Sequence, residues 1–176
     1  RAARDVVGCV AALTGKEPDT VATEAGIPLL LASSTKVALD TDWTDPKRKA
    51  QALDKLMRQL RNLFSYIQSQ LPEEASQPPL RDPLDTLQQI IDQDLEPDPD
   101  DSKGKRVRVR RGVAKDRRIS VSDPDMRHGR KSRSKAFNGF KQHVLVDVDR
   151  KLVLACAVVG ANRREHEAMP ALREDL

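Results

Sequence analysis

The chain has 176 residues, enough for one domain or for a small domain with an extension. Hydrophobic residues make up 38%, aromatic residues 3% and charged residues 33%, and the mean hydropathy is −0.60. This composition is polar for a compact domain, so part of the chain is expected to be loosely ordered. The unbroken apolar stretches, such as residues 29–32, are far shorter than the roughly 20 residues that a membrane-spanning helix needs.

Charge is distributed unevenly along the chain. The formal net charge is +4, but residues 71–102 contain ten acidic residues and one cation, Arg81. Residues 103–143 contain fifteen Lys or Arg and three Asp. The second stretch is therefore a candidate for contact with a polyanion such as nucleic acid.

Two cysteines, Cys9 and Cys156, lie far apart in apolar surroundings, with no CxxC pair and no nearby histidine. This pattern favours buried free thiols over a disulfide and fits a reducing cytosol. The chain opens with Arg1 instead of Met and stops at Leu176 inside an expected helix. We therefore expect the sequence to be an internal piece of a longer protein.

Residues 1–93 are predicted to be mostly helical. Apolar residues recur at helical spacing over 2–13, and Gly15 is suited to a left-handed stop. Short helical segments are expected after Pro18 and Pro28. Each proline takes the first turn of its helix, where a missing N–H costs nothing.

The strongest helix signal begins at Asp45 and Pro46, an N-cap followed by a proline. Its apolar stripe runs from Leu53 to Leu71 and is interpreted as a packing face, with solvated cations on the opposite side. A shorter helix is predicted from Asp82. Residues 94–116, acidic and proline-rich and then basic, contain little apolar surface and are predicted to be a linker.

After residue 116 the period changes from helical to two. Ile119 and Val121 alternate with polar residues and predict a first strand. Residues 140–148 and 152–159 predict an antiparallel hairpin, and the second run is apolar enough to be covered on both faces. A helix is expected from Asn162 onward. The fold class is therefore α+β, with a mostly helical region before a strand, a hairpin and a helix in 117–176.

Residues 120–143 carry the candidate chemistry. Asp123 places a carboxylate at an expected strand end, among cations that could hold a phosphate backbone beside a Mg²⁺ ion. One aspartate alone cannot hold a two-metal site. Because cations 103–118 have no interleaved aromatic residues, backbone contact is expected and base stacking is not. The candidate DNA-binding residues are Arg106, Arg108, Arg110, Arg111, Arg127, Arg130, Lys131, Lys135, Lys141 and His143.

Three phrases occur in a characteristic order: DPDMRHGRKS, FNGFKQHVLVDVDRKLV and ANRREHEAMPAL. With them, residues 117–176 resemble the DDE transposases of bacterial insertion sequences, and Gly139, Phe140, Lys141 and His143 match the family's Gly-aromatic-Lys-x-His strand. The resemblance implies an RNase H-like catalytic domain that cuts and rejoins DNA with Mg²⁺. It further implies the insertion-sequence ends and target DNA as partners, a homodimer for the intact protein, and a cytoplasmic location at the nucleoid.

The chain also departs from that family. Family members use three acidic residues, and the positions of the second and third would follow Leu176. The first is Asp123 or lies upstream of Arg1, and in the second case Asp123 is a structural Asp-Pro turn residue. We therefore expect an inactive fragment of a transposase. Two alternatives remain: a non-catalytic DNA-binding remnant using the basic segment 103–143, and an unrelated protein that binds a partner through its long helix.

Overall fold

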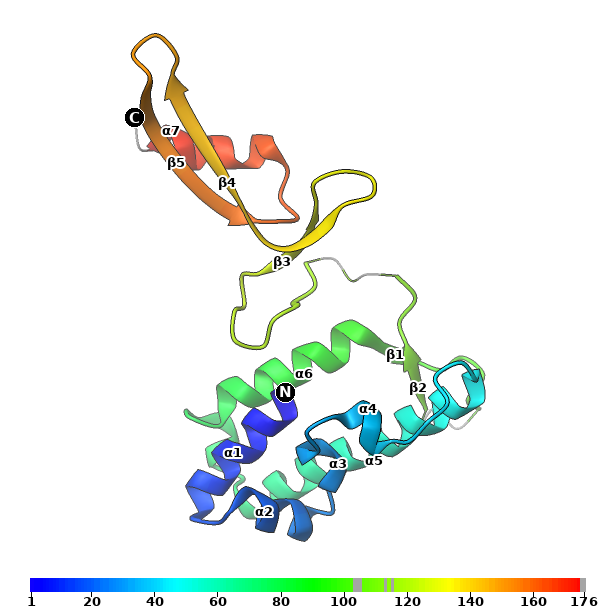
Figure 1. Ribbon diagram of the computed structural model, residues 1–176. Coiled ribbons are helices and arrows are strands. Elements are labelled where there is room, and N and C mark those ends of the chain that lie inside the picture. Colours follow the sequence, from blue (N-terminus) through cyan, green and yellow to red (C-terminus); the bar gives the residue numbers. More distant parts are fainter. Residues whose placement is uncertain (103–105, 113, 115, 175–176) are drawn as a thin grey trace. The chain divides into compact units, whose positions relative to one another are not determined.

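The computed structural model describes residues 1–102, 106–112, 114 and 116–174 (Figure 1). It contains both helices and antiparallel sheets, so the α+β class predicted from the sequence is confirmed. The chain divides into two compact units, Arg1–Gly112 and Val113–Leu176, and the boundary lies inside the segment expected to be a linker. Lys103, Lys105 and Lys115 of the basic segment lie outside the described residues, as do residues 175–176 of the expected last helix. Within the described ranges, no helix is long and apolar enough to cross a membrane.

Unit 1, residues 1–112, begins with four helices: α1 (Ala2–Thr14), α2 (Pro18–Ala25), α3 (Pro28–Leu31) and α4 (Thr35–Ala38). The expected stop at Gly15 is confirmed, because this residue adopts a left-handed conformation with φ 64°. Pro18 and Pro28 both occupy the first turn of their helices, as predicted. Helix boundaries in this region are therefore set by local glycine and proline signals.

Helix α5 (Pro46–Gln70) follows, and its start is the one the sequence predicts. The Asp45 side chain accepts a hydrogen bond from the backbone N–H of Lys47 at 2.8 Å. Its apolar stripe buries Leu60, Leu63 and Ile67. A short 3₁₀ helix, η1 (Glu74–Ser76), then leads to α6 (Arg81–Asp94), which packs on α1. The fully buried side chains of this core are Val6, Val7, Val10, Val21, Ile27, Leu63 and Leu80.

The segment expected to be a linker contains paired strands, which corrects that prediction. Strands β1 (Leu95–Pro97) and β2 (Val107–Val109) are antiparallel, with Glu96 opposite Arg108. The Arg108 guanidinium contacts the Glu96 carboxylate at 2.8 Å, and β2 also contacts α5. Cross-strand charge pairing and packing on a helix supply the stabilisation that the low apolar content alone does not.

Unit 2, residues 113–176, is built on a three-stranded antiparallel sheet in the order β3, β4, β5. Its strands are β3 (Arg127–Arg130), β4 (Ala136–Asp147) and β5 (Leu152–Gly160). The predicted hairpin is confirmed, but the predicted first strand at 119–121 is wrong, because the first strand begins at Arg127. One physical reason is that the Arg118 guanidinium binds the carbonyls of Ser120 and Val121, which gives these groups a partner outside any ladder.

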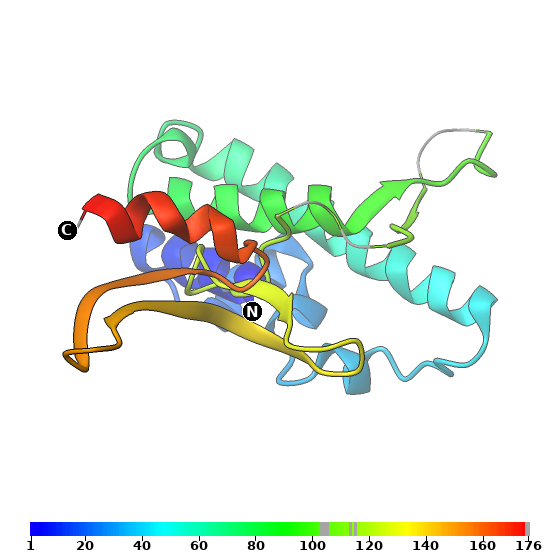
Figure 2. The same ribbon diagram turned by 90° about the horizontal axis from the view of Figure 1, so that it is seen from above.

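A short helical segment covers one face of the β4–β5 hairpin. It consists of η2 (Glu165–Ala168) and α7 (Met169–Glu174), and α7 lies beside β5 in Figures 1 and 2. Leu172 of α7 packs with Ala155 and Ala157 of β5 to form the small core of this unit.

The opposite face of the hairpin is open, so the prediction that both faces of 152–159 are covered is wrong. Alternation along β5 sends Leu154, Cys156 and Val158 away from the side that α7 covers. Leu154 and Val158 are 44% and 64% exposed. Both cysteines are free, as predicted, but Cys156 is exposed and Cys9 is half-buried, so the expectation of two buried thiols is also wrong.

Candidate nucleic-acid interface

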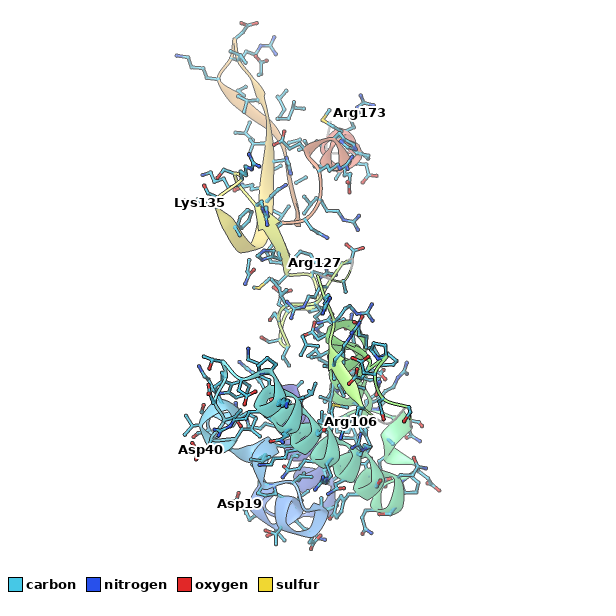
Figure 3. The ribbon with its side chains drawn as sticks, turned by 90° about the vertical axis from the view of Figure 1, so that its right-hand side faces the viewer. Asp19, Asp40, Arg106, Arg127, Lys135 and Arg173 are labelled. Atoms are coloured by element: carbon cyan, nitrogen blue, oxygen red, sulfur yellow. The ribbon has the colours of Figure 1, made fainter. Side chains whose placement is uncertain are left out.

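A compact cationic loop joins β3 to β4. The backbone N–H of Lys131 donates to the carbonyl of Lys135 at 2.9 Å, and the N–H of Lys135 donates to Oγ of Ser132 at 3.1 Å. We call this segment, residues 130–135, the cationic loop; Lys135 is labelled on it in Figure 3. Its four cations are Arg130, Lys131, Arg133 and Lys135, and all four are exposed.

Two further observations favour anion binding at the cationic loop. The sequence has no acidic residue between Met126 and Val146. Among the described residues, no ion pair involves a cation of this loop, although Arg130 donates to the carbonyl of Arg133 at 3.4 Å. The positive charge is therefore concentrated at one end of the sheet and available to an external anion.

The other basic run of the sequence prediction belongs to unit 1, where most of its cations have partners. These cations are Arg106, Arg108, Arg110 and Arg111. The guanidinium of Arg106 lies 3.8 Å from Asp54, and that of Arg108 pairs with Glu96. Arg110 donates to the backbone carbonyls of Asp92 and Leu95. Arg111 is exposed. Intramolecular contacts thus occupy three of these four candidate side chains.

Two predicted contact residues of unit 2 make hydrogen bonds inside the fold, and a ring nitrogen of a third is buried. The Arg127 guanidinium donates to the backbone carbonyls of Pro124 and Met126. The ammonium of Lys141 donates to the carbonyl of Arg163 at 2.7 Å. His143 lies on the same strand face as Lys141, and its Nε2 is buried without a hydrogen-bond partner among the described residues. The sequence predicted that this face could meet DNA, whereas α7 packs against it.

Asp123 makes the hydrogen bonds of a turn. Its Oδ1 accepts from the backbone N–H groups of Asp125, at 3.0 Å, and Met126, at 3.1 Å. Its own N–H donates to Oγ of Ser120 at 3.1 Å. In the part of the chain that the structure describes, no three His, Cys, Asp or Glu side chains lie close enough to hold a metal ion. This is the geometry of the Asp-Pro turn that the sequence left open as the alternative to a metal ligand.

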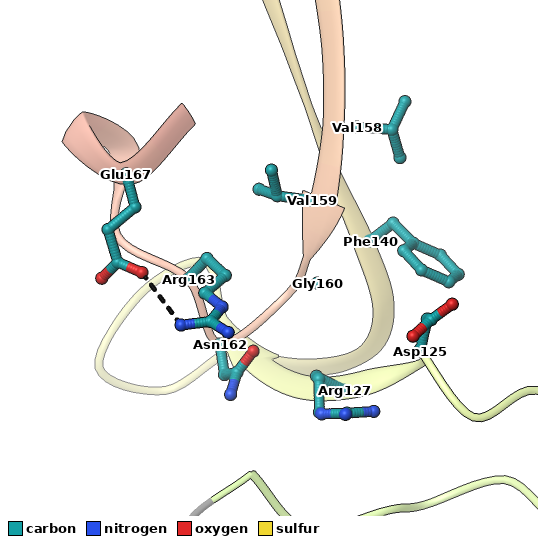
Figure 4. A pocket seen from close by; sticks show the side chains of 9 residues that line it. All are labelled: Asp125, Arg127, Phe140, Val158, Val159, Gly160, Asn162, Arg163 and Glu167. Carbon is teal, nitrogen blue, oxygen red and sulfur yellow. Dashed lines mark hydrogen bonds and ion pairs between the residues drawn. The ribbon is translucent and has the colours of Figure 1, made fainter. Parts of the chain in front are cut away.

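The three phrases that carry the family resemblance meet at one open pocket of about 480 Å³ in unit 2 (Figure 4). Its lining comes from the turn before β3 and the start of β3, from β4, from the end of β5, and from η2 with the turn that leads into it. The lining residues are Asp125, Arg127, Phe140, Val158, Val159, Gly160, Asn162, Arg163 and Glu167. Arg163 reaches Glu167 at 3.3 Å. Sequence reasoning did not single out Asp125, Asn162, Arg163 or Glu167 as site residues, because no local signal marks them.

Beside the pocket, β3 packs closely against the turn that follows β5. A Cβ atom on Gly129 would lie 2.6 Å from Cβ of Ala161 and 2.8 Å from its carbonyl carbon, so only glycine fits this position of β3. The side-chain amide of Asn162 donates to Oδ1 of Asp116 at 2.7 Å, which anchors the turn after β5. Gly129 of the first phrase thus packs directly against Ala161 of the third.

A separate polar cluster, in unit 1, joins α2 and α5 to the residue after the α1 cap. Glu24 Oε2 accepts from the Lys16 ammonium and from the Tyr66 hydroxyl, both at 2.6 Å. The hydrogen bond from Lys16, together with that from Tyr66, lowers the pKa of Glu24, and the Glu24 carboxylate raises the pKa of Lys16 and of Tyr66. Glu24 is exposed, and Lys16 and Tyr66 are half-buried. These hydrogen bonds join α2 and α5 to the end of α1.

Comparison with known proteins finds no matching family model, no matching curated protein and no matching solved structure.

Proposed function

We propose that this chain is an internal piece of a DDE-type transposase of a bacterial insertion sequence, and that unit 2 is a DNA-holding part of its RNase H-like domain. The observation that supports this most is the convergence of the three resemblance phrases on one pocket and one sheet. A strand, an antiparallel hairpin and a helix on one face are the arrangement expected for this part of such a domain. The intact protein would act on the ends of its element and on target DNA, as a homodimer, with Mg²⁺.

The cationic loop is the DNA-contacting element in this proposal. The positive side chains of Lys131, Arg133 and Lys135 attract the phosphate backbone. The hydroxyls of Ser132 and Ser134 can donate hydrogen bonds to phosphate oxygens. The loop is held by its own backbone hydrogen bonds, so less conformational entropy is lost when it binds. Contacts to phosphate carry no base information, so binding is expected to show little sequence preference.

The described carboxylates do not fit a two-metal centre. Asp123 is the one candidate from the sequence, and its Oδ1 already accepts two backbone hydrogen bonds. No metal-dependent step is therefore assigned to this chain. Its proposed contribution is to hold DNA, while the acidic ligands that bind Mg²⁺ in the family would come from elsewhere in the intact protein.

The test replaces the three loop cations together, Lys131→Gln, Arg133→Gln and Lys135→Gln, and measures affinity for a random-sequence duplex at several salt concentrations. Log K falls as log salt rises, and each phosphate contact adds about 0.9 to the steepness of that fall. The loss of three contacts should therefore make the slope shallower by about 3. The affinity near 0.1 M salt should then fall on the order of 10²-fold.

A matched control removes three exposed cations from α5: Lys55→Gln, Arg58→Gln and Arg61→Gln. The net charge changes equally, so a general loss of electrostatic attraction would affect both variants alike. We expect the control to keep most of the wild-type salt dependence. Equal losses in the two variants, or wild-type binding that does not weaken as salt rises, would contradict the proposal.

A further inference from the structure

Phe140 is an exposed aromatic residue on the open face of the sheet in unit 2. Alternation along β4 places it with Asn138 and Gln142 on the exposed side of the strand, and it is 40% exposed. Its partner across the ladder on β5 is Gly160, which has no side chain to cover the ring. The ring is therefore left open to a flat ligand that can stack on it.

The Phe140 ring lines the open pocket of about 480 Å³ in unit 2 (Figure 4). Val158 adds apolar surface to the same lining, and Asp125 adds a carboxylate. Among the described residues, no hydrogen bond or ion pair occupies the Asp125 carboxylate, although its backbone N–H donates to Asp123. An apolar wall beside a free acceptor suits a flat molecule with N–H groups at its edge, which is the chemistry of a nucleobase.

Positive charge lies on the same strand pair as Phe140. Arg130 is opposite Ala136 in the β3–β4 register, and the cationic loop continues from it. Ala136 and Phe140 are four residues apart on β4, so at most about 13 Å separates the two positions. The sequence contains no acidic residue between Met126 and Val146. A phosphate backbone can therefore follow the cationic loop while one of its bases reaches Phe140.

We propose that unit 2 binds single-stranded DNA, with one unpaired base stacked on Phe140 and the backbone phosphates on the cationic loop. The phosphate contact rests on the proposed function, whereas the base contact does not depend on it. A duplex cannot make the base contact, because its bases are stacked on one another. The Asp125 carboxylate repels phosphate and accepts a hydrogen bond from an exocyclic amine, so it favours a base whose edge points into the pocket. Cytosine carries such an amine and thymine does not, so cytosine should bind more tightly.

The first test titrates an oligo-dC strand of about 12 nucleotides, a length within the usual range of single-strand sites. Phe140→Leu keeps most of the apolar volume and removes the aromatic face, so its single-strand affinity should fall about 5- to 100-fold. Its duplex affinity should stay unchanged. Phe140→Trp should retain the single-strand affinity. The matched control is Val144→Ala, which changes a similarly exposed apolar residue of the same strand and should not alter binding.

An abasic strand of the same length is the matched control on the ligand side. It keeps the phosphates and has no bases, so the wild-type chain should bind it about as weakly as Phe140→Leu binds oligo-dC. Fluorescence reports the stacking directly when Phe140→Trp is combined with Trp43→Phe, because the new indole is then the one tryptophan of the chain. Oligo-dC should quench its emission, and the abasic strand should not.

Equal affinity of the wild-type chain for oligo-dC and the abasic strand overturns the proposal, and so does an unchanged affinity in Phe140→Leu. A preference for oligo-dC over oligo-dT that persists in Asp125→Ala, or that is absent from the wild-type chain, overturns the contact between Asp125 and the base. Failure of the proposed function gives a different pattern. The triple variant of the cationic loop would then keep its duplex affinity, while the difference between oligo-dC and the abasic strand remains.

Discussion

Replacing Gly129 by alanine tests the closest packing in the molecule. Gly129 is buried in β3, opposite Phe137 of β4, and lies against the turn that follows β5. The added Cβ would lie 2.6 Å from Cβ of Ala161 and 2.8 Å from its carbonyl carbon. Real Cβ atoms essentially never approach heavy atoms that closely, so either β3 or the turn must move.

The energetic effect follows from which atoms are in the way. Both are backbone or Cβ atoms of Ala161, so no rotamer change relieves the overlap. Overpacking of a well-packed site costs about 1 to 3 kcal/mol, and a rigid neighbour favours the upper end. For a domain of roughly 60 to 100 residues, such as unit 2, each kcal/mol of lost stability lowers the melting temperature by roughly 4 to 8 °C. We therefore expect unit 2 of Gly129→Ala to melt roughly 10 to 20 °C lower.

Gly8→Ala is the matched control. Gly8 is exposed in the middle of α1, and a Cβ added there meets no atom within 4 Å. Alanine in a helix interior is more favourable than glycine by about 0.5 to 1 kcal/mol, so this variant should be slightly stabilised. Thermal unfolding with hydrogen exchange resolved by residue separates the two units. A loss below about 0.5 kcal/mol in unit 2 for Gly129→Ala would refute the close approach of Gly129 and Ala161.

Three further predictions concern the cap, the polar cluster and catalysis. Asp45→Ala removes the N-cap of α5 and should destabilise unit 1 by about 1 kcal/mol in urea unfolding, whereas Asp45→Asn should retain most of the stability. The partners of Glu24 lower its pKa, so the stability that this carboxylate contributes is present above its unfolded-state pKa and is lost as the pH falls through the lower folded-state pKa. Glu24→Gln should remove this acid dependence from unfolding curves. The chain alone should not nick supercoiled DNA with Mg²⁺ or Mn²⁺, and nicking that disappears with Asp123→Ala would show that Asp123 binds the metal.

Local signals in the sequence determined the elements whose causes are themselves local. The Asp45-Pro46 start of α5 depends on one side chain and one ring, and the stop at Gly15 depends on one left-handed residue. The two-residue period of 140–148 depends on neighbours in the chain. The α+β class and the hairpin were therefore predictable, as were two free thiols.

Only the tertiary structure decided which groups satisfy one another across the chain. The ribbon in 94–116 forms because Glu96 meets Arg108 and β2 packs on α5, and composition does not encode that register. The first strand of unit 2 begins at residue 127 instead of 119, because side chains bind the backbone of the intervening residues. Ala155 and Ala157 are buried because α7 packs on that face of β5, through Leu172.

The same distinction applies to the candidate interface. Counting cations predicts one long basic segment, 103–143, but a cation whose charge a carboxylate already neutralises attracts an external phosphate less strongly. In space Arg106 and Arg108 have acidic partners, and the cationic loop, residues 130–135, has none among the described residues. The pocket is likewise assembled from Asp125, Phe140 and Glu167, residues far apart in sequence. The number of cations and the order of the motifs are properties of the sequence. Whether a cation is available to phosphate, and whether distant residues line one pocket, depends on distances that only folding sets.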